Sequence, residues 1–338
     1  MAMTLEQIGE FGLIERISQG CLIRPGSVLR GIGDDAAAVT VTGDKILLLT
    51  TDLLVEGVHF LRRAVSGFDL GYKALAVNLS DIAAMGGIAR EALTSIAVPP
   101  GCEIGFIEEL YRGMKALAGE YKVNIIGGDT TGARSDLAIS VTVTGCVEKE
   151  DMLCRDGARI GDIICLTGFP GESAAGLHLI LNRADAVPAA FDRLLDRHRR
   201  PQPHLLEGRW LARMGAVHAA IDISDGLGSD LGHVIRQSGV GARIDARRLP
   251  VSDLLKTFSR CLGLEPLDYV LDGGEDYILL CTVSPGKMSS LSAGFEKKFG
   301  RPLHRIGEIT ASSHIDLVDE SGKARMISPK GWNHFRRE

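Results

Sequence analysis

The first half of the chain alternates between helical and strand-like spacing of its hydrophobic positions. Apolar residues recur at every third position from Leu5 to Ile17, behind the capping-box pattern TLEQ, which predicts an N-terminal helix. Farther along, long amphipathic stretches that stop at glycines are followed by short apolar runs that end in polar residues. These segments predict helices at 68–87 and 103–121 and strands at 45–52, 123–129 and 137–147.

The second half repeats this mixture after a charged, glycine-bearing stretch at 149–160. That stretch predicts a boundary, and we divide the chain into domains 1–150 and 151–338. Helices and strands in both halves indicate an α/β (α+β) protein of two domains. The later elements are expected as strands at 162–168, 218–224, 242–249 and 276–283, helices at 173–182, 204–215 and 226–238, and a hairpin at 313–327 that turns at 320–323.

The composition favours a globular protein and argues against several classes of partner. With 45% apolar and 24% charged residues, no apolar run long enough for a bilayer and no basic-then-apolar N-terminus, we expect a cytoplasmic protein without a membrane partner. A net charge of −5 argues against nucleic acid, although an anionic substrate can still bind through divalent cations. The seven cysteines form no Cys-x-x-Cys pair, so we expect them to be reduced and mostly buried.

Acidic residues stand at five separate places, each beside a glycine or at the end of an apolar strand. Loops at strand ends gather at one edge of a sheet, where ligands usually bind. If the five places converge, they form a site for a hard cation such as Mg²⁺, which prefers carboxylate oxygens and is completed by substrate phosphates. The five places hold Asp34 and Asp35; Thr50, Thr51 and Asp52; Asn78 and Asp81; Asp129; and Asp222 and Asp225.

Structural interpretations of the same residues stay open beside this one. GIGDD at 31–35 is also typical of a surface turn, and Asp52 and Asp225 are suited to cap the turn and the helix that follow them. Asp81 is harder to explain structurally, because it lies in an apolar predicted helix on the same face as Asn78. The chain has no Gly-x-x-x-x-Gly-Lys-Ser/Thr phosphate loop, so a nucleotide enzyme built on it would rely on metal ions.

The motifs taken together resemble one known family. The chain carries, in order, GIGDD, TTDLLVEGVHF, YKALAVNLSDIAAMGG, IIGGDTT, GESAAGL, IDISDGLGSDLGH, LDGGEDY and KGWNHF, and over about residues 9–335 it resembles the thiamine-monophosphate kinases. These belong to the superfamily that includes aminoimidazole ribonucleotide synthetase. The resemblance implies ATP-dependent phosphorylation of thiamine monophosphate (TMP) to thiamine diphosphate. It also implies an N-terminal metal- and nucleotide-binding domain whose strands pair across a homodimer to close a barrel, and a C-terminal α/β domain.

The resemblance also implies roles for single residues. We expect Asp129 and Asp222 to be catalytic. Gly71 departs from the family pattern, because a better helix former is expected there, and it leaves the start of the helix at 68–87 open. Positions that bind several Mg²⁺ ions match Asp35, Thr50, Thr51, Asp52, Asp81, Asp129, Asp222 and Asp225; ATP contacts match Gly128, Asp129, Arg155 and Ser224; and TMP contacts match His59, Glu275 and Trp332.

The residue types suit this reaction. The phosphate of TMP is already ionised near neutral pH, so no side chain has to remove a proton from it, and the obstacle is repulsion between polyanions that divalent cations cancel. Trp332 offers an aromatic face to the thiamine rings, whereas Trp210 lies in a helical pattern and is expected in the core. Without the resemblance, His59 is interpreted as a structural strand histidine. For Glu275 two interpretations stay open: an acceptor for the aminopyrimidine, or a solvated turn carboxylate in DGGED.

Asp34 and Asp35 are not expected to be equivalent. Successive side chains of an extended segment point to opposite faces, so we expect Asp35 to bind the metal and Asp34 to hold the glycine-rich turn or to face a neighbouring site.

Two other functions remain open. One is a sister ATP-dependent enzyme of the same superfamily, and the other is a non-catalytic metal- or nucleotide-binding module whose aspartates are structural. The sequence weakens the first, because it has no cysteine just ahead of GIGDD and its last cysteine is Cys281, far from the C-terminus.

Overall fold

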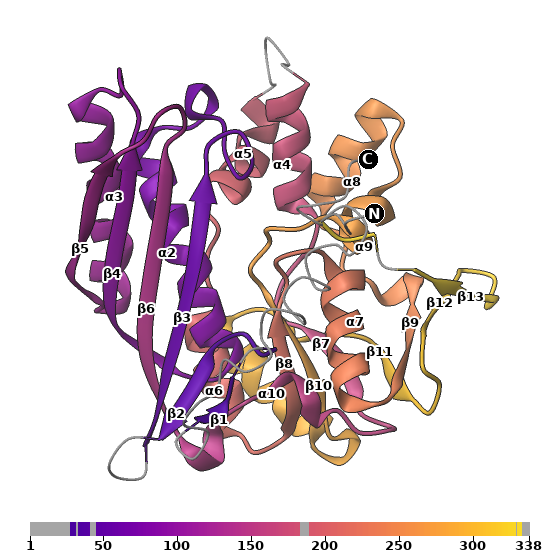
Figure 1. Cartoon of the computed structure of the whole chain (residues 1–338). Helices are drawn as coiled ribbons and strands as arrows, with labels where there is room; N and C mark the ends of the chain where they lie inside the picture. Colours follow the sequence, from indigo (N-terminus) through magenta and orange to yellow (C-terminus); the bar gives the residue numbers. More distant parts are fainter. Residues whose placement is uncertain (1–27, 32, 41–44, 183–188, 329, 333–338) are drawn as a thin grey trace, which may run out of the picture.

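The computed structural model describes residues 28–31, 33–40, 45–182, 189–328 and 330–332. Within them the chain forms two sheets, one in each half, which stand side by side in Figure 1. The N-terminal helix expected at 5–17 lies outside the described residues. Of the six cysteines that are described, Cys154, Cys165 and Cys281 are buried, Cys102 and Cys146 are partly exposed and Cys261 is exposed, so fewer are buried than expected.

The first sheet is antiparallel except for one parallel pair. The predicted strands at 45–52 and 137–147 are confirmed; the first extends to Val55, and the second is shifted by one residue. The strand at 88–98 was not predicted, because its Ala, Arg and Glu residues lack the usual strand composition. The strands, in sheet order, are β1 (Val28–Arg30), β2 (Ala37–Thr40), β3 (Lys45–Val55), β6 (Ala138–Glu148), β4 (Ile88–Val98) and β5 (Asn124–Gly132), with β4 and β5 parallel.

Two helices, α2 (Gly67–Ala84) and α3 (Ile104–Tyr121), pack closely against each other. Ser66 caps α2, because its Oγ accepts a hydrogen bond from the backbone N–H of Asp69 at 3.0 Å. Gly71 lies inside α2, where a Cβ atom would stand 1.7 Å from the carbonyl oxygen of Leu110. The helix therefore begins before Gly71, and the glycine is explained by the close crossing of the two helices.

The second sheet has helices on both faces. Alternate strand residues point to opposite faces, so Ile164 and Leu166 join the hydrophobic core on one face while Cys165 joins the core on the other. In sheet order its strands are β13 (Ala324–Ile327), β12 (Ile315–Val318), β9 (Gly241–Asp245), β11 (His304–Thr310), β7 (Ile163–Leu166), β10 (Leu279–Val283) and β8 (Val217–Asp222). Its helices are α4 (Glu172–Leu181), α5 (Asp192–Arg199), α6 (Leu205–Arg213), α7 (Leu227–Ser238), α8 (Asp253–Leu262), α9 (Pro266–Asp272) and α10 (Met288–Phe299).

The predictions for the second half hold in most places. The hairpin of β12 and β13 is confirmed, and Trp210 packs edge-on against Phe295 and Phe299 in the core, as expected. The strand predicted at 242–249 is too long, because the chain turns into a 3₁₀ segment at Ala246–Arg248.

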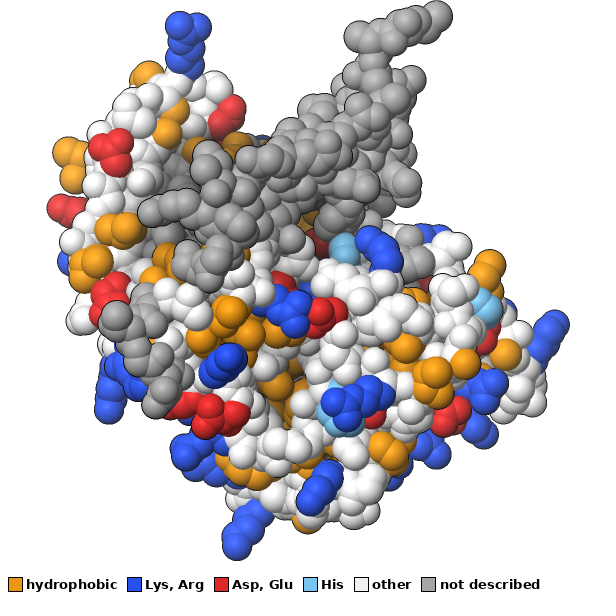
Figure 2. All heavy atoms as spheres, turned by 60° about the horizontal axis from the view of Figure 1, so that its bottom comes forward, with side chains coloured by type: hydrophobic (Ala, Val, Ile, Leu, Met, Phe, Trp, Pro, Cys, Tyr) orange, Lys and Arg blue, Asp and Glu red, His pale blue; other side chains and the backbone are white. Residues whose placement is uncertain are grey.

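Helix α2 joins the two halves. It packs on the first sheet and also contacts α6 and β8 of the second half, so one helix brings its side chains to the boundary between them. The predicted α/β class is confirmed, and none of the described helices is long and apolar enough to cross a membrane. On the face shown in Figure 2, acidic, basic and apolar side chains are interspersed rather than segregated.

Candidate metal and substrate site

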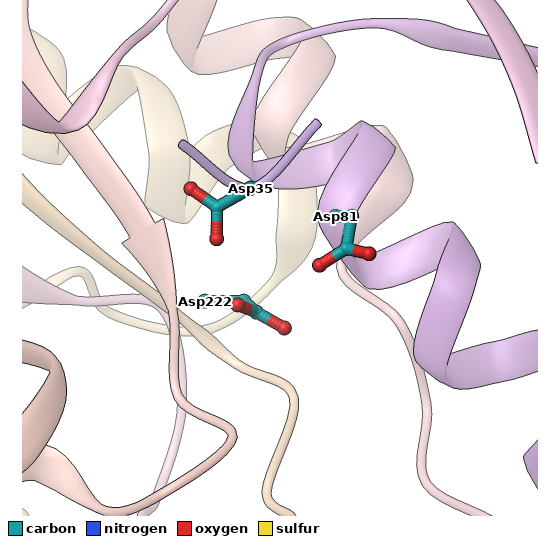
Figure 3. Close-up of side chains that lie close together, drawn as sticks. All are labelled: Asp35, Asp81 and Asp222. Atoms are coloured by element: carbon teal, nitrogen blue, oxygen red, sulfur yellow. The ribbon is translucent and has the colours of Figure 1, made fainter. Parts of the chain in front are cut away.

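Three carboxylates from distant parts of the chain meet at the boundary between the halves. Asp35 precedes β2, Asp81 lies near the end of α2, and Asp222 is the last residue of β8. One oxygen of each lies within 4.8 Å of the others, and Figure 3 shows the side chains converging. We call Asp35, Asp81 and Asp222 the acidic trio. It joins three of the five acidic places that the sequence singles out.

The electrostatics of the acidic trio call for a cation. Burial and the neighbouring carboxylates of Asp52 and Asp222 raise the pKa of Asp81 well above its usual range. Burial and the charge of Asp35 likewise raise the pKa of Asp222. Like charges that converge in a site of low polarity disfavour ionisation unless a positive charge is supplied. Clustered hard oxygen donors are the ligands that Mg²⁺ prefers, so the residues fit this ion.

Neighbouring side chains hold the acidic trio in place. Thr50 donates a hydrogen bond to Asp81, and Ser80 Oγ donates to Asp222 Oδ2 at 2.6 Å. Asn78 Oδ1, one helical turn before Asp81, is buried and accepts no hydrogen bond from any described residue. The sequence pattern missed Ser80, because a serine inside a helix gives no signal until Asp222 is brought beside it.

The surface-turn interpretation of GIGDD is wrong for its two aspartates. The side chain of Asp34 is 5% exposed and that of Asp35 is 0% exposed. The guanidinium of Arg155 donates hydrogen bonds to both carboxylate oxygens of Asp35, at 2.6 and 2.8 Å. Asp34 Oδ1 accepts a hydrogen bond from the backbone N–H of Asp35 at 3.0 Å, which is the local bond expected of a turn residue. Burial beside Asp35 raises the pKa of Asp34 to about 6.

Strand β3 divides its polar residues between two faces. Thr50 and Asp52 point toward the acidic trio, whereas Thr51 lies on the opposite, exposed face, where Thr142 Oγ1 donates to its hydroxyl at 2.9 Å. Asp52 was expected at the end of a strand but lies inside β3, which continues to Val55. Burial raises the pKa of Asp52 to about 6.

The structure does not bring Asp129 to the acidic trio. It lies within β5 rather than at the strand's end, is exposed, and accepts a hydrogen bond from the N–H of Thr130 at 2.9 Å. The neighbouring residue Gly128 is in register with Asp52, which lies three strands away in the sheet. At the usual spacing between strands, the backbones of these two residues are roughly 14 Å apart. A Cβ at Gly128 would stand 1.7 Å from the carbonyl oxygen of Thr94, so the strand pairing itself requires glycine.

The loop after β8 is held by a residue that the sequence analysis missed. Asp230 Oδ2 accepts hydrogen bonds from the backbone N–H groups of Ser224, Asp225 and Gly226 at 3.1 to 3.2 Å. The N-cap of α7 is Gly226, so the interpretation of Asp225 as the cap is wrong. An acidic residue in the first helical turn is common at a helix N-terminus, which is why Asp230 gave no distinct signal.

A second cluster, of mixed charge, lies around Glu275. Its Oε1 is 2.5 Å from Lys73 Nζ of α2, and its Oε2 is 3.4 Å from His198 Nδ1 of α5. Burial alone would raise the pKa of Glu275, but the neighbouring groups, above all the charge and the hydrogen bond of Lys73, hold the pKa below its usual value. The interpretation of Glu275 as a solvated turn carboxylate is therefore wrong.

The loop that carries Glu275 has an unusual backbone. Glu275 and Tyr277 have φ of 63° and 53°, and each left-handed non-glycine residue costs on the order of 1–3 kcal/mol. The surrounding structure fixes this loop, because the N–H of Glu275 donates to the Ser224 carbonyl at 2.7 Å and Asp276 accepts from the N–H of Gly171 at 2.6 Å. Such strain is typical of functional loops.

The other two residues expected to contact TMP come from other parts of the chain. His59 follows β3 in a turn rather than in a strand, and its Nδ1 accepts a hydrogen bond from the N–H of Val55 at 3.0 Å. It also has a small electrostatic influence on Glu275. The side chain of Trp332 is exposed (53%), and the backbone N–H of this residue donates to the carbonyl of Asp225 at 3.3 Å. The C-terminal segment thus packs on the loop after β8 and presents an aromatic ring beside it.

Comparison with known proteins covers both halves. Models of the AIR synthase related protein match the chain at residues 33–147 for the N-terminal domain and 159–320 for the C-terminal domain. Thiamine-monophosphate kinases from Aquifex aeolicus, Escherichia coli K12 and Bacillus subtilis are 37%, 41% and 38% identical, over 97–98% of this chain and 98–100% of theirs.

Solved structures agree in fold. One described as AaThiL complexed with AMPPCP and TMP has a TM-score of 0.86 at 35% identity and covers 99% of both chains. The thiamine-monophosphate kinase of Stenotrophomonas maltophilia has a TM-score of 0.76 at 37% identity, covering 94% of this chain and 98% of its own. The hydrogenase maturation protein HypE, at 20% identity and a TM-score of 0.70, shares the fold alone.

Proposed function

The chain belongs to the thiamine-monophosphate kinases of the AIR synthase related family, and from this premise we propose that it transfers the γ-phosphoryl group of ATP to TMP, yielding thiamine diphosphate and ADP. The observation that carries the proposal is the acidic trio, which gathers carboxylates from both halves at their boundary. Phosphoryl transfer is catalysed mainly by positioning and electrostatic stabilisation, which such a cluster can supply through metal ions.

The acidic trio would hold the magnesium ions of the reaction. Bound Mg²⁺ cancels the repulsion between the phosphates of donor and acceptor. Within the chain, Thr50 and Ser80 orient the Asp81 and Asp222 carboxylates, and Asp52 adds a further negative charge at the same place. The metal roles of Thr51, Asp129 and Asp225 stay predictions.

The nucleotide is assigned to the side of the acidic trio that Arg155 occupies. A guanidinium with several donors in one plane suits phosphate oxygens, and Arg155 already lies against Asp35 at the boundary. Ser224 lies in the loop that Asp230 holds beside Asp222. The contacts of Gly128 and Asp129 with ATP stay predictions.

TMP is assigned to the cluster of mixed charge around Glu275, which includes Lys73 and His198. The ionised Glu275 can accept a hydrogen bond from the amino group of the pyrimidine, and the exposed ring of Trp332 can stack on thiamine or attract its cationic thiazolium. His59 acts electrostatically on Glu275, and on that ground we assign it to the same substrate. The acceptor phosphate is already ionised, so none of these residues has to act as a general base.

We also propose a homodimer. The edge strand β5 is exposed along most of its length, with Ile126 61% exposed, and Leu53 and Leu93 on the outer face of the first sheet are 55% and 43% exposed. Unpaired edges and exposed apolar faces favour pairing with another chain. Light scattering should report a dimer that Ile126→Asp weakens. The division at 150/151 and the cytoplasmic location also stay predictions.

Turnover tests the function. Purified protein with Mg-ATP and TMP should form thiamine diphosphate and ADP in equal amounts, and it should do so only when TMP is present. ADP release that does not depend on TMP would favour a sister enzyme with another acceptor. No product above a boiled control would overturn the kinase assignment in favour of a non-catalytic binding module.

A further inference from the structure

A buried lysine that phosphoryl transfer does not require lies between the two halves. Lys73 is 3% exposed in the middle of α2, and Glu275 is its ion-pair partner. A cation in such a place is costly unless it is paired, and a buried ion pair is often no more stabilising than apolar residues of the same volume. Stability alone therefore gives a weak reason for a lysine at this position.

The contacts of Lys73 point to the orientation of one carboxylate. Lys73 Nζ reaches across the boundary to Glu275 Oε1 at 2.5 Å, while His198 Nδ1 stands 3.4 Å from Oε2. His198 Nδ1 is in turn 3.1 Å from Ser173 Oγ. Both oxygens of Glu275 therefore have neighbours on defined sides, one from the first half of the chain and one from the second.

The backbone beneath Glu275 makes this orientation dependent on its partners. Glu275 has a φ of 63°. Before it, a Cβ at Gly274 would stand 2.4 Å from the Ser224 carbonyl oxygen; after it, Asp276 accepts a hydrogen bond from the N–H of Gly171 at the start of α4. The main chain is thus fixed by the second half alone. The side chain, by contrast, takes its strongest contact from α2 of the first half.

We propose that Lys73 is a positioning residue for TMP: it fixes the Glu275 carboxylate and so ties the TMP pocket to the packing of α2 against the second half. This rests on the proposed function, in which Glu275 contacts TMP. Without Lys73 the backbone at Glu275 stays in place, but the side-chain carboxylate loses the contact that orients it. Binding of TMP should therefore weaken, whereas binding of ATP, which is assigned to the acidic trio, should not.

Kinetics of Lys73→Met, Lys73→Arg and a control test the proposal. Lys73→Met should raise KM for TMP on the order of 10- to 100-fold and leave KM for ATP within about twofold, because misplacing one binding group acts on the substrate it orients. Lys73→Arg, which keeps the charge, should recover part of the loss. The control Lys115→Met removes an exposed lysine of α3 and should change neither constant. An unchanged KM for TMP, or equal rises for both substrates, would overturn the proposal.

A double variant separates positioning from general damage. In a Glu275→Gln background, Lys73→Met should add little to KM for TMP, because both changes act through one carboxylate. Fully additive effects would show that Lys73 acts elsewhere. If Lys73→Met does not fold, the same cycle is run with Lys73→Arg. A wild type that makes no thiamine diphosphate overturns the function, while the Lys73–Glu275 coupling is still measured as shifts in melting temperature over the same four proteins.

Discussion

The acidic trio and the Lys73–Glu275 pair bury carboxylates at the same boundary, yet their charges are arranged in opposite ways. In the trio, burial and like charges raise the pKa of Asp81 and Asp222. In the pair, the neighbouring groups, above all Lys73, offset burial and lower the pKa of Glu275. Arg155 pairs with Asp35 but does not offset the raised pKa of Asp81 and Asp222, which is why we propose that the trio binds cations from solution. Glu275, by contrast, has its cationic partner within the chain.

The largest effect should follow from neutralising the acidic trio. Asp222→Asn removes a proposed metal ligand and should lower kcat by about 1,000-fold or more. Because it also relieves repulsion between like charges, the free energy of unfolding in EDTA should be unchanged or higher. Steady-state kinetics and denaturant unfolding measure the two quantities. The matched control is Asp253→Asn, whose carboxylate is fully exposed on α8. Near-normal turnover at saturating Mg²⁺ would contradict the assignment.

Next in size is the difference between the two neighbouring aspartates. Asp35→Asn takes a carboxylate from the trio and leaves Arg155 without its closest partner, so kcat should fall by roughly 100-fold or more. Asp34→Asn disturbs mainly a turn and should cost about 10-fold or less. Parallel kinetics on the two variants decide the matter, and equal losses would refute the ordering.

A smaller effect should appear in the pH dependence of the free energy of unfolding, through His198 beside Glu275. Burial and the charge of Lys73 lower the pKa of His198 to about 4, below its usual value near 6.5. The unfolded chain therefore binds a proton below about pH 6.5 that the folded chain refuses until about pH 4, so stability is full above pH 6.5 and is lost as the pH falls.

Between pH 6.5 and 5 this loss should reach about 2 kcal/mol, and His198→Asn should remove it from the pH profile. Urea unfolding at pH 7 and pH 5 on both proteins measures the difference. Identical slopes against pH for wild type and variant would show that His198 does not titrate as described.

The smallest effect is expected from Trp332→Ala. Loss of stacking or cation–π contact should raise KM for TMP by about 3- to 10-fold, since such contacts contribute about 0.5–2 kcal/mol. KM for ATP should stay constant, and Trp210, which lies in the core, cannot replace the lost ring. A change in KM for ATP instead would place the aromatic contact on the nucleotide side.

Much of the fold followed from periodicity, because the long helices and the alternating strands have strong local patterns. The sequence prediction failed where tertiary contacts, rather than local patterns, determine the structure. Gly71 and Gly128 are explained by the backbone they approach, and β4 carries charges that hide its place inside a sheet. Sequence spacing cannot give strand order, which is why Asp129 was expected beside residues that lie several strands away.

The candidate site was predictable in part for the same reason. Asp35, Asp81 and Asp222 stood out because carboxylates beside glycines or in apolar segments are unusual. Lys73, Ser80 and Asp230 did not, since a polar residue in a helix normally faces water and only its partner across the boundary gives it a role. Residues that hold functional groups in place are thus the part that a single sequence conceals.

Anomalous diffraction from crystals grown with Mn²⁺, AMPPCP and TMP tests the central contrast most directly. Mn²⁺ takes the place of Mg²⁺ at oxygen sites and reveals its position. We predict a metal peak within about 2–2.5 Å of carboxylate oxygens of Asp81 and Asp222, and none at the Lys73–Glu275 pair. Peaks confined to sites away from the acidic trio, in an enzyme that turns over with Mn²⁺, would contradict this account.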